Sequence, residues 1–218
     1  MFLHAALTPP SEVLEAVGLA VQAAQPPDVP VPQPPPPRRG AFERLSGRHV
    51  QVAEPRTEPV SVFELVPANR LCLSIAGFGS VTMGDAIRVA ETLKEEAEQW
   101  ATPTVHVAGA ALHEASGRRS IVLTLDGEVA ELQSVARAVT QCVQRRGFRF
   151  DRRVFQPHLE VATIAAAATP SQVMSFLNAL EGFQGPPWAI DHLSLLKRSF
   201  DTAAIDSMEY LRIPLGRH

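Results

Sequence analysis

Short stretches in which apolar and polar residues alternate are separated by longer stretches in which apolar residues recur every three or four positions. Leu71, Leu73 and Ile75 illustrate the first pattern, which is typical of a strand with one buried face. The second pattern is typical of an amphipathic helix. Together they predict strands at about 2–7, 69–75, 104–112, 119–125, 154–163, 190–197 and 208–213, and helices at about 11–24, 83–101, 129–144 and 171–180.

The order strand, helix, strand, strand occurs twice along the chain. Thr82 is a good N-cap for the second helix, and Gly147 follows the third helix where a glycine commonly ends one. This order predicts an α+β fold of two similar lobes, with mostly antiparallel sheets flanked by helices. The repeat is visible in the order of the elements and hardly at all in the residues themselves.

A proline-rich segment interrupts this pattern after the first helix. Prolines are so frequent at positions 26–37 that the segment is neither a helix nor a central strand, and polyproline II is the conformation this composition favours. We expect a single domain of two lobes over residues 1–218, with an inserted loop at about 26–59. The loop is either a plain surface connection or a docking segment for a protein partner that recognises proline-rich sequences.

Composition and charge narrow the classes of function. The 218-residue chain is 45% hydrophobic and has a formal net charge of −3, so it has the apolar content of a globular protein and no overall positive charge for binding long nucleic acids. Cys72 and Cys142 form no metal-binding or redox pair, which is typical of a reduced intracellular protein. Because the sequence has no bilayer-spanning apolar run and no signal-peptide pattern, we expect a cytoplasmic protein without membrane contact. Zinc-type spacings and glycine-rich phosphate loops do not occur either, so no metal or cofactor is expected.

Two of the predicted strands carry strings that stand out as counterparts. The later string reads Phe155-Gln156-Pro157-His158-Leu159-Glu160, and the earlier one reads Asn69-Arg70-Leu71-Cys72-Leu73-Ser74 and is followed by Gly77-Phe78-Gly79. These strings resemble the paired motifs of the 2H phosphoesterases, the superfamily of the bacterial RNA 2′,3′-cyclic phosphodiesterases once called 2′–5′ RNA ligases. Members carry one His-x-Thr/Ser motif in each of two lobes around a cleft, and the second motif typically reads Phe-x-Pro-His-Leu-Thr. Residues 2–9 and 192–199 also resemble the family, so the likeness covers nearly the whole chain outside the insertion.

The signature positions depart from the family pattern. By this resemblance the first motif histidine falls on Arg70 and its hydroxyl residue on Cys72, whereas the second histidine is kept as His158 and its hydroxyl residue falls on Glu160. A shifted alignment of the first motif stays open. Because residues i and i+2 of a strand point to the same face, the resemblance implies that each pair faces the cleft.

These replacements bear directly on the chemistry. In the family, one histidine activates water, the other protonates the leaving ribose oxygen, and the hydroxyls hold the phosphate. Arg70 stays protonated and cannot replace an acid–base group, although a guanidinium binds phosphate well. Cys72 is a weak donor, and an ionised Glu160 accepts hydrogen bonds and repels phosphate. The opposite charges of Arg70 and Glu160 predict an ion pair across the cleft, with open phosphate binding by Arg70 as the alternative.

Basic residues are interleaved with aromatic ones just before the second motif. Arginines stand at 145, 146, 149, 152 and 153 around Phe148 and Phe150. Such interleaving can grip single-stranded nucleic acid by charge and stacking. The alternative is a solvated strand edge whose phenylalanines face the core.

The sequence therefore supports two hypotheses of function. The first is a catalytically degenerate 2H-like protein that binds a nucleotide or RNA end in the cleft, or a protein through the proline-rich loop, without turning over substrate. The second is an active phosphodiesterase, a hydrolase of RNA 2′,3′-cyclic or 2′–5′ linkages, with His158 as its single motif histidine and Arg70 stabilising charge on the phosphate. Glu160 favours the first hypothesis, because a carboxylate aimed at the phosphate would oppose hydrolysis. Whether the chain is an enzyme stays open.

Overall fold

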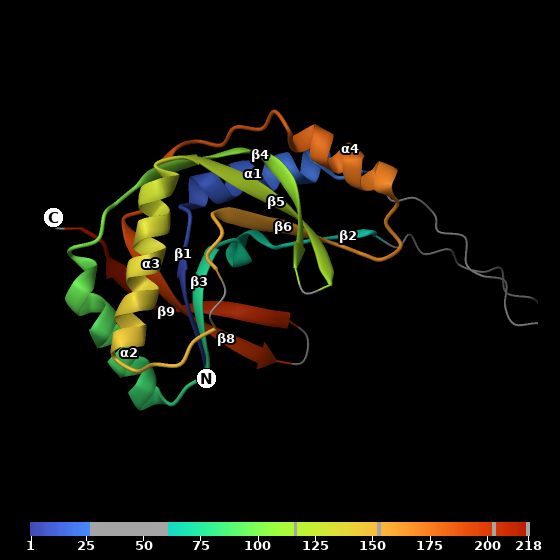
Figure 1. Cartoon of the computed structure of the whole chain (residues 1–218). Helices are drawn as coiled ribbons and strands as arrows, with labels where there is room; N and C mark the ends of the chain where they lie inside the picture. The colour runs from blue at the N-terminus through green and yellow to red at the C-terminus, as the bar shows by residue number, and fades with distance from the viewer. Residues whose placement is uncertain (27–60, 116, 152–153, 202–203, 217–218) are drawn as a thin grey trace, which may run out of the picture.

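The computed structural model describes residues 1–26, 61–115, 117–151, 154–201 and 204–216 (Figure 1). For residues 198–201 and 204–207 it describes the backbone alone. The proline-rich insertion expected at about 26–59 therefore lies outside the described residues except for its first residue, and the proposed docking of a protein partner there lies outside them too. In chain order the elements are β1 (Phe2–Leu7), α1 (Ser11–Ala24), β2 (Phe63–Leu65), η1 (Ala68–Arg70), β3 (Leu73–Ser80), α2 (Met83–Ala97), β4 (Thr104–Ala115), β5 (Arg118–Gly127), α3 (Val129–Arg145), β6 (His158–Ile164), α4 (Pro170–Leu180), β7 (Trp188–Ala189), β8 (His192–Asp201) and β9 (Ala204–Pro214).

The strands form two antiparallel sheets, one for each lobe. One sheet has the order β3-β1-β8-β9, and the other has the order β2-β6-β5-β4-β7. β1 is a central strand of the first sheet, and all its residues after Phe2 are buried. The expected α+β fold with two lobes of antiparallel sheet is confirmed.

The helices cover the two sheets in pairs (Figure 1). α2 and α3 lie side by side, with α2 against β9 and α3 against β3 of the four-stranded sheet. α1 and α4 pack together, and α4 also packs against β4 of the five-stranded sheet. Apolar residues of both sheets and of all these helices join one hydrophobic core. None of the helices in the described ranges is long and apolar enough to cross a membrane.

The first motif differs locally from the predicted strand. The strand expected from residue 69 begins only at Leu73, because the chain first makes the short 3₁₀ helix η1. The backbone N–H of Arg70 donates to the carbonyl of Pro67 at 2.8 Å, which closes this turn. Arg70 therefore lies on a turn before the strand, while Leu71 and Leu73 are still buried and Cys72 between them is half-buried.

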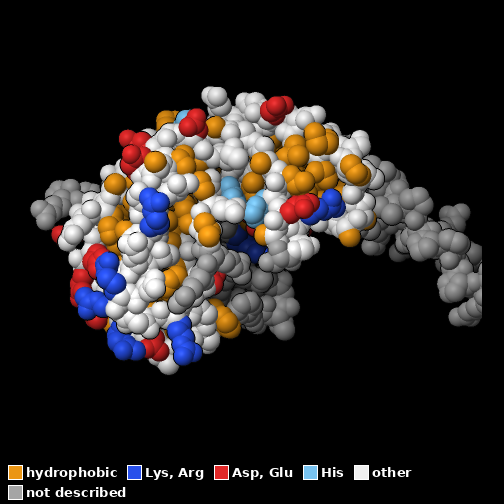
Figure 2. Space-filling model, in the orientation of Figure 1, with side chains coloured by type: hydrophobic (Ala, Val, Ile, Leu, Met, Phe, Trp, Pro, Cys, Tyr) orange, Lys and Arg blue, Asp and Glu red, His pale blue; other side chains and the backbone are white. Residues whose placement is uncertain are grey.

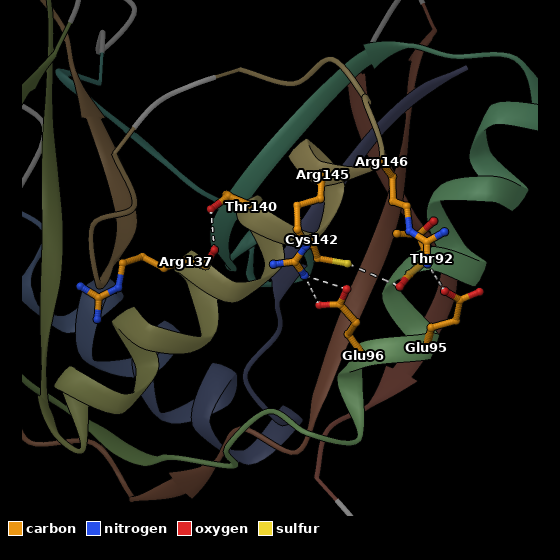
Figure 3. A network of polar contacts seen from close by, with 8 residues as sticks. All are labelled: Thr92, Glu95, Glu96, Arg137, Thr140, Cys142, Arg145 and Arg146. Carbon is orange, nitrogen blue, oxygen red and sulfur yellow. Dashed lines mark hydrogen bonds and ion pairs between the residues drawn. The ribbon is translucent and has the colours of Figure 1, made fainter.

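Two arginines of the basic segment, Arg145 and Arg146, form ion pairs between α3 and α2 (Figure 3). Nη2 of Arg145 donates to both carboxylate oxygens of Glu96 at 2.7 and 2.5 Å, and Nη2 of Arg146 donates to Glu95 at 2.5 Å. The buried thiol of Cys142 donates to the carbonyl of Thr92 at 3.5 Å, and burial raises the pKa of this thiol to about 11. These arginines are structural, and the Cys142 thiol is protonated at neutral pH.

Candidate functional site

A cleft of about 650 Å³ lies between the two sheets. It is lined by residues of β1, β3, β8 and β9 from one sheet, of β2, β5 and β6 from the other, and of η1 between them. Figure 2 shows a hollow near the middle of one face, with a basic side chain inside it and histidine side chains at its edge. The polar side chains that line the cleft belong to His4, Thr8, Glu64, Asn69, Arg70, Cys72, Ser74, Arg118, Asp151, Glu160, Thr163 and Glu209.

Three of the residues singled out in the sequence meet in this cleft. Arg70, Cys72 and Glu160 all line it, although they come from segments about ninety positions apart along the chain. His158, the fourth, is not among the lining residues.

The geometry of β6 explains which of its side chains reach the open face. Leu159 and Val161 are fully buried, so His158 and Glu160 point to the opposite face of the strand. A β-bulge follows, because Ile121 of β5 pairs with Ala162 while its neighbour pairs with Glu160. The extra residue shifts the alternation by one, and Thr163 returns to the face of Glu160.

Glu160 pairs with Arg118 rather than with Arg70. Nη2 of Arg118 on β5 lies 3.6 Å from Oε1 of Glu160 and donates to Oγ1 of Thr163 at 3.2 Å. The predicted ion pair between Arg70 and Glu160 is therefore wrong: β5 pairs directly with β6, so its arginine reaches Glu160 first. Arg70 makes no ion pair with any other residue that the structure describes.

The first motif presents a hydroxyl that the sequence alignment passed over. Cys72 and Ser74 both line the cleft, and Ser74 lies on β3 opposite Ala6 of β1. Their i, i+2 spacing equals that of the family motif, so a shifted alignment would match the thiol with the histidine and the hydroxyl with the threonine. The string Cys72-Leu73-Ser74 is therefore a shifted alignment of the first motif, the alternative that the sequence left open beside Arg70 and Cys72.

His158 lies against a histidine of β4. The ring centroids of His158 and His113 are 4.8 Å apart, with the ring planes tilted by 47°. Burial of the half-buried imidazole, and then the neighbouring charge of His113, lower the pKa of His158. His158 therefore stays neutral at physiological pH. Sequence reasoning did not single out His113, because a contact between β4 and β6 across the intervening strand β5 leaves no local signal in the sequence.

The remaining carboxylates of the cleft are mostly engaged. Burial tends to raise the pKa of Glu209, but hydrogen bonds from Arg212 and Ser194 outweigh this and lower it, so Glu209 is ionised. Oδ1 of Asp151 accepts the backbone N–H of Gly77 at 2.7 Å. Within the described ranges, no group of three or more His, Cys, Asp or Glu side chains could hold a metal ion.

Known structures with the same architecture include TT0787 of Thermus thermophilus, with 16% identity, full coverage of both chains and a TM-score of 0.58. A structure described as a phosphoesterase has 16% identity, covers 98% of this chain and 97% of its own and has a TM-score of 0.62. E. coli LigT bound to 3′-AMP has 16% identity, the same coverage and a TM-score of 0.61.

Sequence comparison adds no closer relationship, since no protein-family model and no curated protein matches the chain. At this level of identity the structural likeness concerns the fold and leaves the activity open. LigT belongs to the 2H phosphoesterases, and its structure is matched over nearly the whole of both chains. The fold that the sequence resemblance implied is thus confirmed: this chain has the two-lobed α+β fold that LigT has.

Proposed function

We propose that this chain is a non-hydrolysing binding protein of the 2H fold, which recognises the phosphate end of a nucleotide or RNA in the cleft between its lobes. The observation that carries the proposal is Arg70, which lines the cleft and makes no ion pair with a described residue. A guanidinium binds phosphate through two charged hydrogen bonds. The hydroxyls of Ser74 and Thr163 line the same cleft and are further donors.

The electrostatics of the cleft are compatible with an anion at Arg70. Glu160 forms an ion pair with Arg118, and Glu209 is hydrogen-bonded by Arg212. Glu64 on β2 is the lining carboxylate whose side chain makes no ion pair or hydrogen bond with a described residue. Repulsion of phosphate is therefore weaker than a count of the acidic side chains alone would suggest.

The same groups argue against hydrolysis. Acid–base cleavage needs one group to take a proton and another to give one, and each contributes about 10²- to 10⁴-fold in rate. Neither Arg70 nor Cys72 supplies the missing histidine. His4 lines the cleft but is only 5% exposed on β1. Glu160 stands where a phosphate-holding hydroxyl would be needed.

The ligand class follows from the chemistry of the donors and agrees with what related folds bind. E. coli LigT has been crystallised with 3′-AMP, with phosphate, with ATP and with NADP⁺. These ligands share a phosphate group, and all but free phosphate also carry a nucleoside. We therefore expect a phosphorylated nucleoside or RNA end rather than an uncharged ligand.

Binding of a fluorescent trinucleotide that ends in a 3′-phosphate tests the proposal. We expect Arg70→Gln to weaken the affinity about tenfold or more, because hydrogen bonds between charged groups contribute about 1.5–3 kcal/mol. Arg137→Gln is the matched control, since Arg137 is exposed on α3 outside the cleft. Equal affinities of the wild type and Arg70→Gln would refute the role of Arg70.

The second candidate function is residual hydrolysis through His158. It is favoured by the lowered pKa of His158 and by the neighbouring His113, which together offer a neutral imidazole as a base. Incubation of the wild type with RNA ending in a 2′,3′-cyclic phosphate, followed by product analysis, separates the two functions. Cleavage that disappears in His158→Ala would replace our proposal by an active phosphodiesterase.

A further inference from the structure

A second pocket, of about 410 Å³, adjoins the cleft on the side away from Arg70. The two cavities share the lining residues His4, Gly77 and Asp151, so they adjoin each other along β1 and β3. The second pocket is further lined by Phe2, Phe150 and Arg149. Nothing in the chemistry described for the cleft uses these three side chains.

This pocket accounts for Arg149 and Phe150 of the basic and aromatic segment, while Arg152 and Arg153 lie outside the described residues. Arg145 and Arg146 are held by α2, and the ring of Phe148 lies 5.9 Å from the guanidinium of Arg88. Arg149 is exposed and makes no ion pair with any described residue, and Phe150 is half-buried beside it. The segment therefore divides between residues that hold the fold and residues that line a cavity.

The wall that carries Phe150 is fixed against β3. The backbone N–H of Asp151 donates to the carbonyl of Gly77 at 2.8 Å, and Oδ1 of Asp151 accepts the N–H of Gly77 at 2.7 Å. A Cβ at Gly77 would lie 3.1 Å from Oδ2 of Asp151, so glycine permits this close approach. Phe2, whose side chain is 43% exposed, lines the pocket from β1. The aromatic rings thus sit on a preformed surface rather than on a free strand.

We propose that this pocket is a nucleobase subsite for a single-stranded RNA whose terminal phosphate occupies the cleft, an inference that rests on the proposed function. Aromatic rings and an arginine next to them bind bases of any sequence by stacking and cation–π contact. Because the pocket adjoins the cleft, one extended ligand can occupy both. A phenylalanine ring stacks on the π face of any base, so this contact does not depend on which base is bound.

The spacing along β3 sets the length of that ligand. Ser74 lines the cleft and Phe78 lines the second pocket, and four residues of strand span about 13 Å at roughly 3.3 Å per residue. Arg70 lies still further from the pocket along the chain. The base attached to the phosphate-bearing ribose cannot cover this span, so the stacked base belongs to a preceding nucleotide. The preferred ligand is therefore an oligonucleotide and not a mononucleotide.

Affinities of 3′-AMP and of a trinucleotide 3′-phosphate, compared across variants, test the inference. We expect the trinucleotide to bind the wild type at least about fivefold more tightly than 3′-AMP, the lower end of what one stacked base contributes. In Phe150→Leu the ratio of the two affinities falls towards one, because leucine keeps the apolar contact but has no π face. In Arg149→Gln the ratio also falls, because the cation–π contact with the base is lost. Phe148→Leu and Arg137→Gln, which change residues outside the pocket, keep the ratio of the wild type.

Each outcome bears on one proposal or on both. A trinucleotide that binds no more tightly than 3′-AMP, or a ratio that survives in both pocket variants, overturns the subsite, while weaker binding of both ligands to Arg70→Gln would still support the cleft. No measurable binding of either ligand would overturn the proposed function and the subsite together. Unchanged thermal unfolding of Arg149→Gln, an exposed position, shows that its effect does not arise from loss of the fold.

Discussion

At the scale of single residues, the protonation of His158 makes the stability of the folded chain depend on pH. Burial and His113 both disfavour its charged form, so its pKa in the folded chain lies below the value of about 6.5 expected in the unfolded chain. As the pH falls below about 6.5, the unfolded chain takes up a proton that the folded chain resists, and stability decreases. Above that pH both states hold the neutral ring, and the full stability is present.

We therefore expect His158 to titrate below its ordinary range, and His113→Ala to raise its pKa by removing the neighbouring charge. NMR titration of the imidazole C–H signals measures both values directly. His106, which lies on β4 like His113, provides the control His106→Ala, which should leave the titration of His158 unchanged. A His158 pKa that does not move in His113→Ala would show that burial alone sets it.

At the scale of elements, the sequence predicted most helices and strands because their apolar periodicity is strong. Thr82 accepts the backbone N–H of Asp85 at 3.1 Å, as expected of the N-cap of α2. The sequence did not predict the short strand β2, since its three residues owe their conformation to pairing with β6. The bulge in β6 was also missed, because a change of register depends on the partner strand and leaves no mark in the periodicity.

The N-terminus of α4 allows a local test of how much a helix cap contributes to the stability of the fold. Thr169 and Gln172 form a capping box around Pro170 at the first helical position, with Oγ1 of Thr169 accepting the Gln172 N–H at 3.3 Å. We expect Thr169→Ala to lower the free energy of unfolding by about 1 kcal/mol, because it removes this acceptor. Urea denaturation at constant m-value measures the change. Ser171→Ala, at an exposed position in the same turn, should stay within about 0.5 kcal/mol of the wild type; a similar loss in both variants would contradict the role of the cap.

At the scale of the whole molecule, the fold and the chemistry of the site are determined by different residues. The buried apolar residues of β1, β3 and β6 belong to the core of the two-lobed fold, which is shared with LigT at 16% identity. The chemistry of the cleft depends on a few side chains whose neighbours in space come from other strands. Reasoning from the sequence therefore predicted that Arg70, Cys72 and Glu160 lie in one cleft. It could not predict the contact of Arg118 with Glu160, because strand pairing and side-chain length determine that contact.

If the fold is intact and only the reacting groups are lost, restoring those groups should restore hydrolysis. Cys72 and Ser74 hold the i, i+2 spacing of the family motif, so Cys72→His supplies a second acid–base group beside an existing hydroxyl. Glu160→Thr removes the carboxylate and supplies a donor on the face of β6 that carries His158. We expect the double variant to cleave an RNA 2′,3′-cyclic phosphate about 10²-fold or more faster than the wild type, with little gain in either single variant, since acid and base act as a unit.

Chromatography of the products measures this rate, and adding His158→Ala to the double variant should abolish it. A folded double variant that binds the RNA but leaves it intact would show that the cleft lacks more than these two groups. His158 packs beside His113 and is not among the lining residues of the cleft, which would then be the reason for the inactivity, because a base out of reach of the phosphate cannot act on it.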